Sequence, residues 1–112
     1  MKEKFYSFIK NLQDKITKEF ELIDGNEFFA EDVWQRKEGG GGRTRILQNG
    51  GVFEKGGVNI SKVYGKLPKS MQSYFKVGDV DFFACGLSLV MHPKNPMTPT
   101  VHANWRYFEM YD

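Results

Sequence analysis

Residues 38–61, EGGGGRTRILQNGGVFEKGGVNIS, decide how the chain is interpreted, because they combine strand-like patterning with a high density of glycine. Residues 43–47 and 52–63 follow a period of two on either side of Asn49-Gly50. This dipeptide is typical of a β-hairpin with a type I′ turn, because that turn needs positive φ at both central residues. The stretch therefore predicts two paired strands, at about residues 43–48 and 51–63.

The run Gly39–Gly42 within this stretch admits three interpretations: a flexible linker, a phosphate cradle, or a loop that lies close to a ligand. Residues 38–45 contain no G-x-x-x-x-G-K-[ST], and no G-x-G-x-x-G precedes a helix. A linker is disfavoured because strand-like sequence flanks the run within a few residues. Glycine lacks a Cβ, so the third interpretation, a close approach of backbone to ligand, is the one that remains.

The segment before this stretch is helical in pattern. Apolar side chains recur at helical spacing through residues 3–23, which is typical of one amphipathic helix packed on a sheet. Its polar face mixes both charge signs, which disfavours a membrane-surface helix. Asp24-Gly25-Asn26 is expected to end it. The apolar positions are Phe5, Phe8, Ile9, Leu12, Ile16, Phe20 and Ile23.

Composition limits the class of protein. The 112 residues suggest one domain, and 40% hydrophobic with 27% charged residues is not a disordered composition. A net charge of +2 is too small to favour a nucleic-acid partner. The single Cys85 excludes an internal disulfide and a cysteine-based zinc site, and it fits a reducing compartment. No stretch approaches the roughly 18 apolar residues of a membrane span. We therefore expect a cytoplasmic protein with no membrane span.

Further strands are predicted at about residues 31–37, 82–92 and 100–110, with residues 65–80 as a connecting segment. Successive strand residues face opposite sides of a sheet. One face of residues 82–92 is wholly apolar and includes Cys85, so it is expected to be core. If the last two strands pair antiparallel, Trp105 lies on the opposite face from a continuous polar surface. That surface consists of Ser88, His92, His102, Asn104 and Arg106.

This polar surface favours a binding site for an anionic small molecule. Imidazole can exchange protons near neutral pH, so His92 or His102 is a candidate general acid or base. Two imidazoles alone do not complete a zinc shell. Guanidinium groups bind carboxylate or phosphate with two parallel hydrogen bonds, and Arg36, Arg43, Arg45 and Arg106 lie in or beside these elements. The residues predict an α+β domain with a sheet-borne pocket, and they leave an enzyme and a binding module equally supported.

Two long blocks carry a family resemblance. WQRKEGGGGRTRILQNGGVFEKGGVNIS (34–61) and GLSLVMHPKNPMTPTVHANWRYFE (86–109) closely resemble the oxygen-dependent coproporphyrinogen III oxidases. The resemblance implies an antiparallel β-sheet flanked by helices, and a working homodimer. It also implies oxidative decarboxylation of two propionates of coproporphyrinogen III to vinyl groups, which gives protoporphyrinogen IX. Molecular oxygen is the implied co-substrate, with no organic cofactor and with a divalent metal attributed to some bacterial members.

The resemblance also implies roles for particular residues. His102, in T-x-H-x-N-x-R, matches the family's proton donor, and Ser88 in G-x-S-L-V matches a substrate-contacting serine. Asn104, Trp105 and Arg106 match a substrate-contacting segment. His92 and His102 match metal positions of bacterial members. The glycine run is interpreted as a loop at the rim of a tetrapyrrole pocket. Arg43 and Arg45, which follow it, are candidate partners for the propionates.

Family members are longer than this chain. The chain is therefore expected to correspond to the N-terminal part of the enzyme and to lack turnover alone. The alternative is a tetrapyrrole-binding module without catalysis, and a nucleic-acid binder is disfavoured. An exposed sheet edge would favour self-association.

Overall fold

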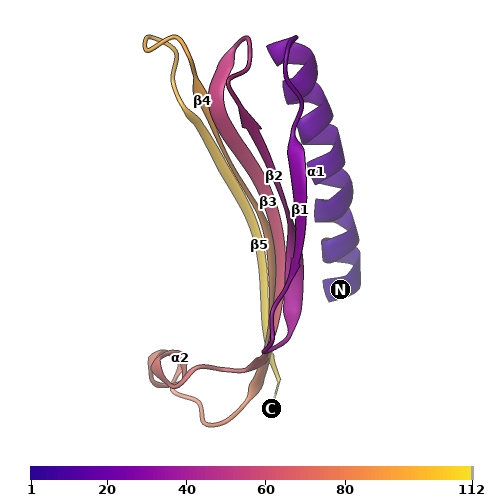
Figure 1. Cartoon of the computed structure of the whole chain (residues 1–112). Coiled ribbons are helices and arrows are strands. Elements are labelled where there is room, and N and C mark those ends of the chain that lie inside the picture. Colours follow the sequence, from indigo (N-terminus) through magenta and orange to yellow (C-terminus); the bar gives the residue numbers. More distant parts are fainter. Residues whose placement is uncertain (112) are drawn as a thin grey trace.

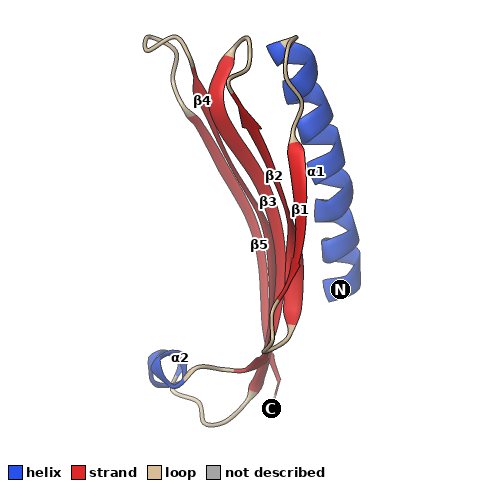
Figure 2. Cartoon of the chain, in the orientation of Figure 1, coloured by secondary structure: helices blue, strands red, loops and turns tan. Residues whose placement is uncertain are grey.

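The computed structural model describes residues 1–111 and shows a curved antiparallel sheet with one long helix along one face (Figure 1). The strands pair in the order β1-β2-β3-β4-β5, so each strand lies beside the next one along the chain (Figure 2). This architecture confirms the α+β class. The elements are α1 (Lys2–Asp24), β1 (Ala30–Gln35), β2 (Gly40–Gln48), β3 (Phe53–Lys66), α2 (Lys69–Phe75), β4 (Asp81–Pro93) and β5 (Val101–Tyr111).

Helix α1 ends where the sequence predicts. Gly25 adopts the left-handed conformation with φ of 73°, and its N–H donates to the Glu21 carbonyl at 3.0 Å. The predicted apolar stripe was wrong at two positions, because Phe8 and Ile23 are 51% and 58% exposed. The face against the sheet instead includes polar side chains that find hydrogen-bond partners there. Its fully or nearly buried residues are Ile9, Gln13, Thr17 and Asp24.

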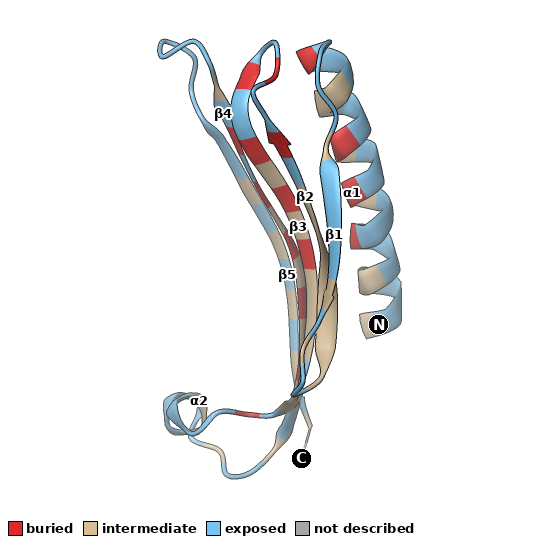
Figure 3. Cartoon of the chain, in the orientation of Figure 1, coloured by how far each residue is buried: buried red, intermediate tan, exposed pale blue. Residues whose placement is uncertain are grey.

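The core lies between α1 and one face of the sheet. Alternate residues of β3 and β4 point toward the helix and are buried, which Figure 3 shows as red bands along these strands. The opposite face of the same strands carries no long helix (Figure 3). The core cluster consists of Ile9, Leu47, Phe53, Val58, Ile60, Phe83, Cys85, Leu87, Leu89 and Met91.

The β2–β3 hairpin is present, but its turn differs from the predicted type I′ turn. Asn49 has a φ of 55°, whereas Gly50 does not adopt positive φ. Four residues, 49–52, connect the two strands. The carboxylate of Asp24 accepts the N–H groups of Gly51, Val52 and Phe53, each at 2.9 Å. A side chain from the end of α1 therefore shapes a turn that local sequence alone would make shorter.

The expectation that the glycine run forms a loop was wrong. Strand β2 begins at Gly40, and Gly40–Gly42 pair with β3. A Cβ on Gly40 would collide with the Lys62 carbonyl oxygen, and one on Gly41 with that of Trp34. The glycines therefore permit close approach between neighbouring strands of the sheet itself.

Residues 65–80 are not only a connection. β3 extends into the start of this segment as far as Lys66, and α2 forms before β4 begins at Asp81. Pro68 precedes α2, and Lys76 ends it in the left-handed conformation with φ of 59°. The short helix lies at one end of the sheet, away from α1 (Figure 1). The lack of periodicity over so few residues explains why the sequence did not predict it.

Candidate functional site

A row of polar residues crosses the sheet on the face opposite α1. The register pairs Thr44 of β2 with Asn59 of β3, Asn59 with Ser88 of β4, and Ser88 with Asn104 of β5. Directly opposed residues of paired antiparallel strands share one face of the sheet. Four neighbouring strands thus place hydroxyl and amide groups side by side along one line. We call this face the open face.

The next row along the open face has three small residues followed by one arginine. Gly42, Ser61, Gly86 and Arg106 are opposed in turn across β2 to β5. Small residues at the centre leave space above the sheet. A cavity of about 500 Å³ lies there, and Met71 of α2 contributes to its wall. Its polar lining residues are Arg36, Asn59, Ser61, Ser88, Asn104, Arg106 and Tyr107.

A smaller cavity of about 180 Å³ continues the open face toward His102. It shares Asn59 and Ser88 with the larger cavity, so the two meet at the polar row. His102 is exposed and lies opposite Val90 in the register. The arrangement puts an imidazole beside the hydroxyl and amide groups of the row.

The charges of these cavities favour an anionic ligand. Neither cavity is lined by Asp or Glu, whereas Arg36 and Arg106 line the larger one. Within residues 1–111, Arg106 forms no ion pair, and its Nε donates to Asn104 Oδ1 at 3.3 Å. Its guanidinium therefore retains donors for a carboxylate. Arg36 is more engaged, because Nη1 donates to the Gly39 carbonyl at 2.9 Å and Nη2 lies 3.8 Å from Glu38.

The open face collects the five polar residues that the sequence grouped together. Ser88, Asn104 and Arg106 line the larger cavity, and His102 lines the smaller one. His92 shares their face near the end of β4, where its Nδ1 lies 3.4 Å from Thr100 Oγ1. Trp105 lies on the opposite face, half-buried and packed against the core. Any ligand contact from Trp105 on the open face would have to come from its backbone.

Arg43 and Arg45 lie on the helix face, so their expected placement beside this pocket was wrong. In β2 they are opposed to Ile60 and Val58, whose side chains belong to the core. Arg45 contacts Asp14 at 2.9 Å and Glu31 at 2.8 Å. Both guanidinium groups are thus occupied by neighbouring carboxylates under α1, because odd-numbered residues of β2 face the helix.

The residues of this region do not complete a metal site. Among residues 1–111, no group of three or more His, Cys, Asp or Glu side chains could hold a metal ion. His92 and His102 are on neighbouring strands, two positions apart in the β4–β5 register. Two imidazoles without a carboxylate are an incomplete ligand set for a divalent ion. Metal binding at His92 and His102 stays a prediction.

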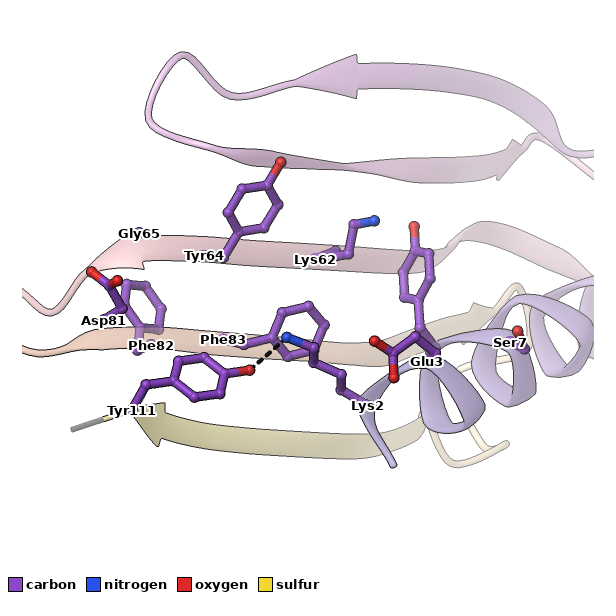
Figure 4. Close-up of a pocket in the computed structure, with 11 residues that line it drawn as sticks. Lys2, Glu3, Ser7, Lys62, Tyr64, Gly65, Asp81, Phe82, Phe83 and Tyr111 are labelled. Atoms are coloured by element: carbon purple, nitrogen blue, oxygen red, sulfur yellow. Dashed lines mark hydrogen bonds between the residues drawn. The ribbon is translucent and has the colours of Figure 1, made fainter.

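Another cavity, of about 660 Å³, lies on the other side of the sheet, between the start of α1 and the ends of the strands (Figure 4). Lys2 donates from Nζ to the Tyr111 hydroxyl at 2.7 Å, and Figure 4 shows the two side chains in contact. Lys62 Nζ lies 4.7 Å from the centre of the Tyr6 ring. Asp81 and Glu3 also line this cavity, so both charge signs are present. Its acidic residues distinguish it from the two open-face cavities, which no Asp or Glu of the described chain lines.

Sequence reasoning missed Asn59 and Ser61 as members of the site. Both were assigned to a strand, but only the faces of the last two strands were followed residue by residue. The alternation in VNIS (58–61) carried the signal, because Val58 and Ile60 are buried. The two polar residues between them must therefore face the other side.

Fold and site together give an antiparallel sheet whose open face carries two adjoining cavities, lined by arginine in the larger one and, among residues 1–111, by no Asp or Glu in either. The family model described as coproporphyrinogen III oxidase matches residues 4–112. The chain belongs to this family, which confirms the resemblance of its two sequence blocks.

Individual relatives agree with this assignment. The chain is 53% identical over 110 residues to an oxygen-dependent coproporphyrinogen-III oxidase of Prochlorococcus marinus strain MIT 9515. It is 49% identical over 116 residues to coproporphyrinogen-III oxidase 1, chloroplastic, of Arabidopsis thaliana. These matches cover 96% and 97% of the chain but only 32% and 30% of the relatives. The chain thus spans about a third of the length of these curated relatives.

Proposed function

We propose that the open face is part of the substrate site of an oxygen-dependent coproporphyrinogen III oxidase. In this reaction each of two propionates loses carbon dioxide and a hydride equivalent and becomes a vinyl group. Molecular oxygen accepts the hydride equivalent and, with one proton, becomes hydrogen peroxide. The product is protoporphyrinogen IX, and the pathway is haem biosynthesis.

One observation carries the proposal most directly. The cavity above Ser61 and Gly86 is bordered by Arg106, whose guanidinium has no carboxylate partner among residues 1–111, and no acidic side chain lines the cavity. A substrate with several propionates needs such a cation, and a guanidinium binds a carboxylate with two parallel hydrogen bonds. The small residues let a wide, flat macrocycle approach the sheet.

The open-face residues have distinct tasks in this proposal. Arg106 and Ser88 hold a propionate in place, with Asn104 orienting the guanidinium through its Oδ1. His102 lies in the adjoining cavity, where imidazole can deliver or accept a proton at the pyrrole ring or the carboxyl group. Holding the reacting propionate in one orientation lowers the entropic part of the barrier.

Several further properties belong to the same proposal. The full-length protein is a cytoplasmic homodimer that uses molecular oxygen without an organic cofactor. The single cysteine, buried in the core, fits a reducing compartment. A divalent ion at His92 and His102 would need further ligands from outside this chain. In the described part of the chain, neither helix is both long and apolar enough to cross a membrane.

We further propose that these 112 residues bind the substrate without turning it over. The curated relatives that carry the activity in their names are about three times as long as the match. The alternative, a tetrapyrrole-binding module that does not catalyse, predicts the same binding.

The test is a titration of the chain with coproporphyrin III, the stable oxidised form of the substrate, followed by absorbance and fluorescence. We expect saturable binding that Arg106→Ala weakens about tenfold or more, since a hydrogen bond to a charged group contributes roughly 1.5–3 kcal/mol. Etioporphyrin, which lacks carboxylates, is the control ligand and should bind no better to wild type than to the variant. Absence of coproporphyrin binding would contradict the proposed site.

An oxygen electrode with coproporphyrinogen III separates the two functions. A relative of full family length, such as the Prochlorococcus marinus oxidase, should consume oxygen, and the 112 residues alone should not. Oxygen uptake by the isolated chain would contradict the proposal that it does not turn the substrate over. Binding without oxygen uptake when these 112 residues replace the matching third of that relative would favour the non-catalytic module.

A further inference from the structure

A chain of two hydrogen bonds crosses the open face from β1 to β3. Trp34 Nε1 donates to Thr44 Oγ1 at 3.0 Å, and Thr44 Oγ1 in turn donates to Asn59 Oδ1 at 2.6 Å. An indole N–H can only donate, so the Thr44 oxygen accepts from Trp34 and its own proton is free for Asn59. The 2.6 Å distance is typical of an O–H···O hydrogen bond.

This direction fixes the orientation of the Asn59 side chain. Its oxygen accepts the hydrogen bond from Thr44 on the β2 side, so its amino group is left to donate on the β4 side. Within residues 1–111, Asn59 Nδ2 donates to no protein acceptor, although the residue is half-buried. Asn59 lines both open-face cavities and lies directly opposite Ser88.

We propose that Asn59 is a ligand-binding residue whose amino group donates to a carboxylate of the bound molecule, beside Ser88. Thr44 and Trp34 are positioning residues, because they hold the amide in the orientation that presents donors. The inference rests on the proposed function, and it adds a third donor between Ser88 and the β2 side of the cavity.

The location supports a carboxylate as the partner group. An amide whose oxygen is already bound can only donate further, and carboxylates are the acceptors of a propionate-bearing ligand. The only acidic residue of the same row, Asp32, is opposed to Thr44 on β1 and lines neither cavity. In the described part of the chain, no acidic side chain that lines the cavities therefore competes with a ligand carboxylate for the Asn59 amino group.

The test compares variants that change donors while keeping shape, with coproporphyrin III as the probe and the 112-residue chain as the protein. Asn59→Asp keeps the acceptor for Thr44 and replaces the amino group with a repelling oxygen, so we expect affinity to fall tenfold or more. Thr44→Val removes the hydroxyl and should reduce affinity about threefold to tenfold. Thr44→Ser restores the hydroxyl and should restore affinity.

Two further measurements exclude a merely structural effect. The urea midpoints of Asn59→Asp and wild type should agree, since both side chains have the same size. In ¹⁵N-labelled protein, the two Asn59 side-chain amide protons should shift on addition of coproporphyrin III. The amide signals of Asn26, an exposed asparagine that lines neither open-face cavity, serve as the internal control.

The outcomes distinguish this inference from the function on which it rests. If wild type binds coproporphyrin III and Asn59→Asp binds equally well, the role of Asn59 is overturned and the proposed site stands. If Thr44→Ser fails to restore affinity, the positioning by Thr44 is overturned. If wild type binds no coproporphyrin III, both the site and the inference are overturned.

Discussion

Asp24 Oδ1 accepts the backbone N–H of Phe53 at 2.9 Å, and this contact ties the end of α1 to the start of β3. The same carboxylate accepts three further N–H groups, from Glu27, Gly51 and Val52, at 2.9–3.0 Å. One buried side chain therefore accepts hydrogen bonds from backbone N–H groups both just after the helix and in the hairpin turn. A carboxylate at a helix C-terminus opposes the helix dipole, so these hydrogen bonds must outweigh that cost.

Asp24→Asn is expected to destabilise the fold by about 2–3 kcal/mol, because an amide offers one oxygen and turns an amino group toward backbone donors. Urea denaturation followed by circular dichroism measures the change. Glu27→Gln is a matched control, since the Glu27 side chain is exposed and only its backbone contacts Asp24. Equal stability of Asp24→Asn and wild type would show that the contact is dispensable.

Asp24 also predicts how stability depends on pH. Burial alone would raise the pKa of this carboxyl, but the N–H groups of Phe53, Val52, Gly51 and Glu27 hold its pKa well below the usual range. The unfolded carboxyl titrates near pH 3.9, so its contribution is fully present above about pH 5 and is lost as pH falls further. The stability difference between wild type and Asp24→Asn should therefore shrink from about pH 6 to about pH 3. A constant difference across this range would contradict the prediction.

The glycines of β2 are expected to matter for stability through the sheet. A Cβ on Gly42 would collide with the Trp34 ring and the Ile60 carbonyl oxygen. Gly42→Ala should therefore lower the free energy of unfolding by about 1–3 kcal/mol. Valine at Gly40 or Gly41 should lower the stability of the fold more than its affinity for coproporphyrin III. Gly57→Ala is the matched control, because its nearest neighbour would be the Arg45 carbonyl oxygen at 3.8 Å. Urea midpoints compare the variants, and equal losses at Gly42 and Gly57 would argue against the steric explanation.

Arg45 is expected to serve the fold and not the ligand. Its guanidinium contacts Asp14, Glu31 and Thr17 beneath α1. Arg45→Met keeps the stem but removes one of the two guanidinium partners of Asp14 and Glu31, and Arg43 still contacts both carboxylates, so stability should fall by about 1 kcal/mol. Coproporphyrin III affinity should stay within about twofold of wild type, in contrast to Arg106→Ala. A tenfold loss of affinity with unchanged stability would indicate that Arg45 binds the ligand and would contradict this prediction.

The sequence predicted the helix, the strands and the open face because each follows a local period. Ser88 and Asn104 could be grouped because alternation alone puts them on one side of neighbouring strands. Arg43 and Arg45 were misplaced because Ile46 and Leu47 put one apolar side chain on each face of the strand, so alternation did not show which face is buried. The turn at Asn49-Gly50 depends on Asp24, 25 residues earlier, and no local rule includes that contact.

The aromatic contact between α2 and the sheet gives a last prediction. The Phe75 ring stacks on that of Phe108 at 5.6 Å between centroids, and Phe108 in turn lies 6.2 Å from Phe82. Phe108→Ala removes this stacking partner and should loosen α2. Because Met71 of the same helix borders the larger cavity, the change should weaken coproporphyrin III binding about threefold or more. Hydrogen exchange of residues 69–75 should accelerate in the variant while exchange in β3 stays slow. Phe28→Ala removes the same type of side chain at a position that is 75% exposed and does not line the cavity, and it should change neither measurement. Unchanged exchange in α2 after Phe108→Ala would show that the helix is held by other contacts.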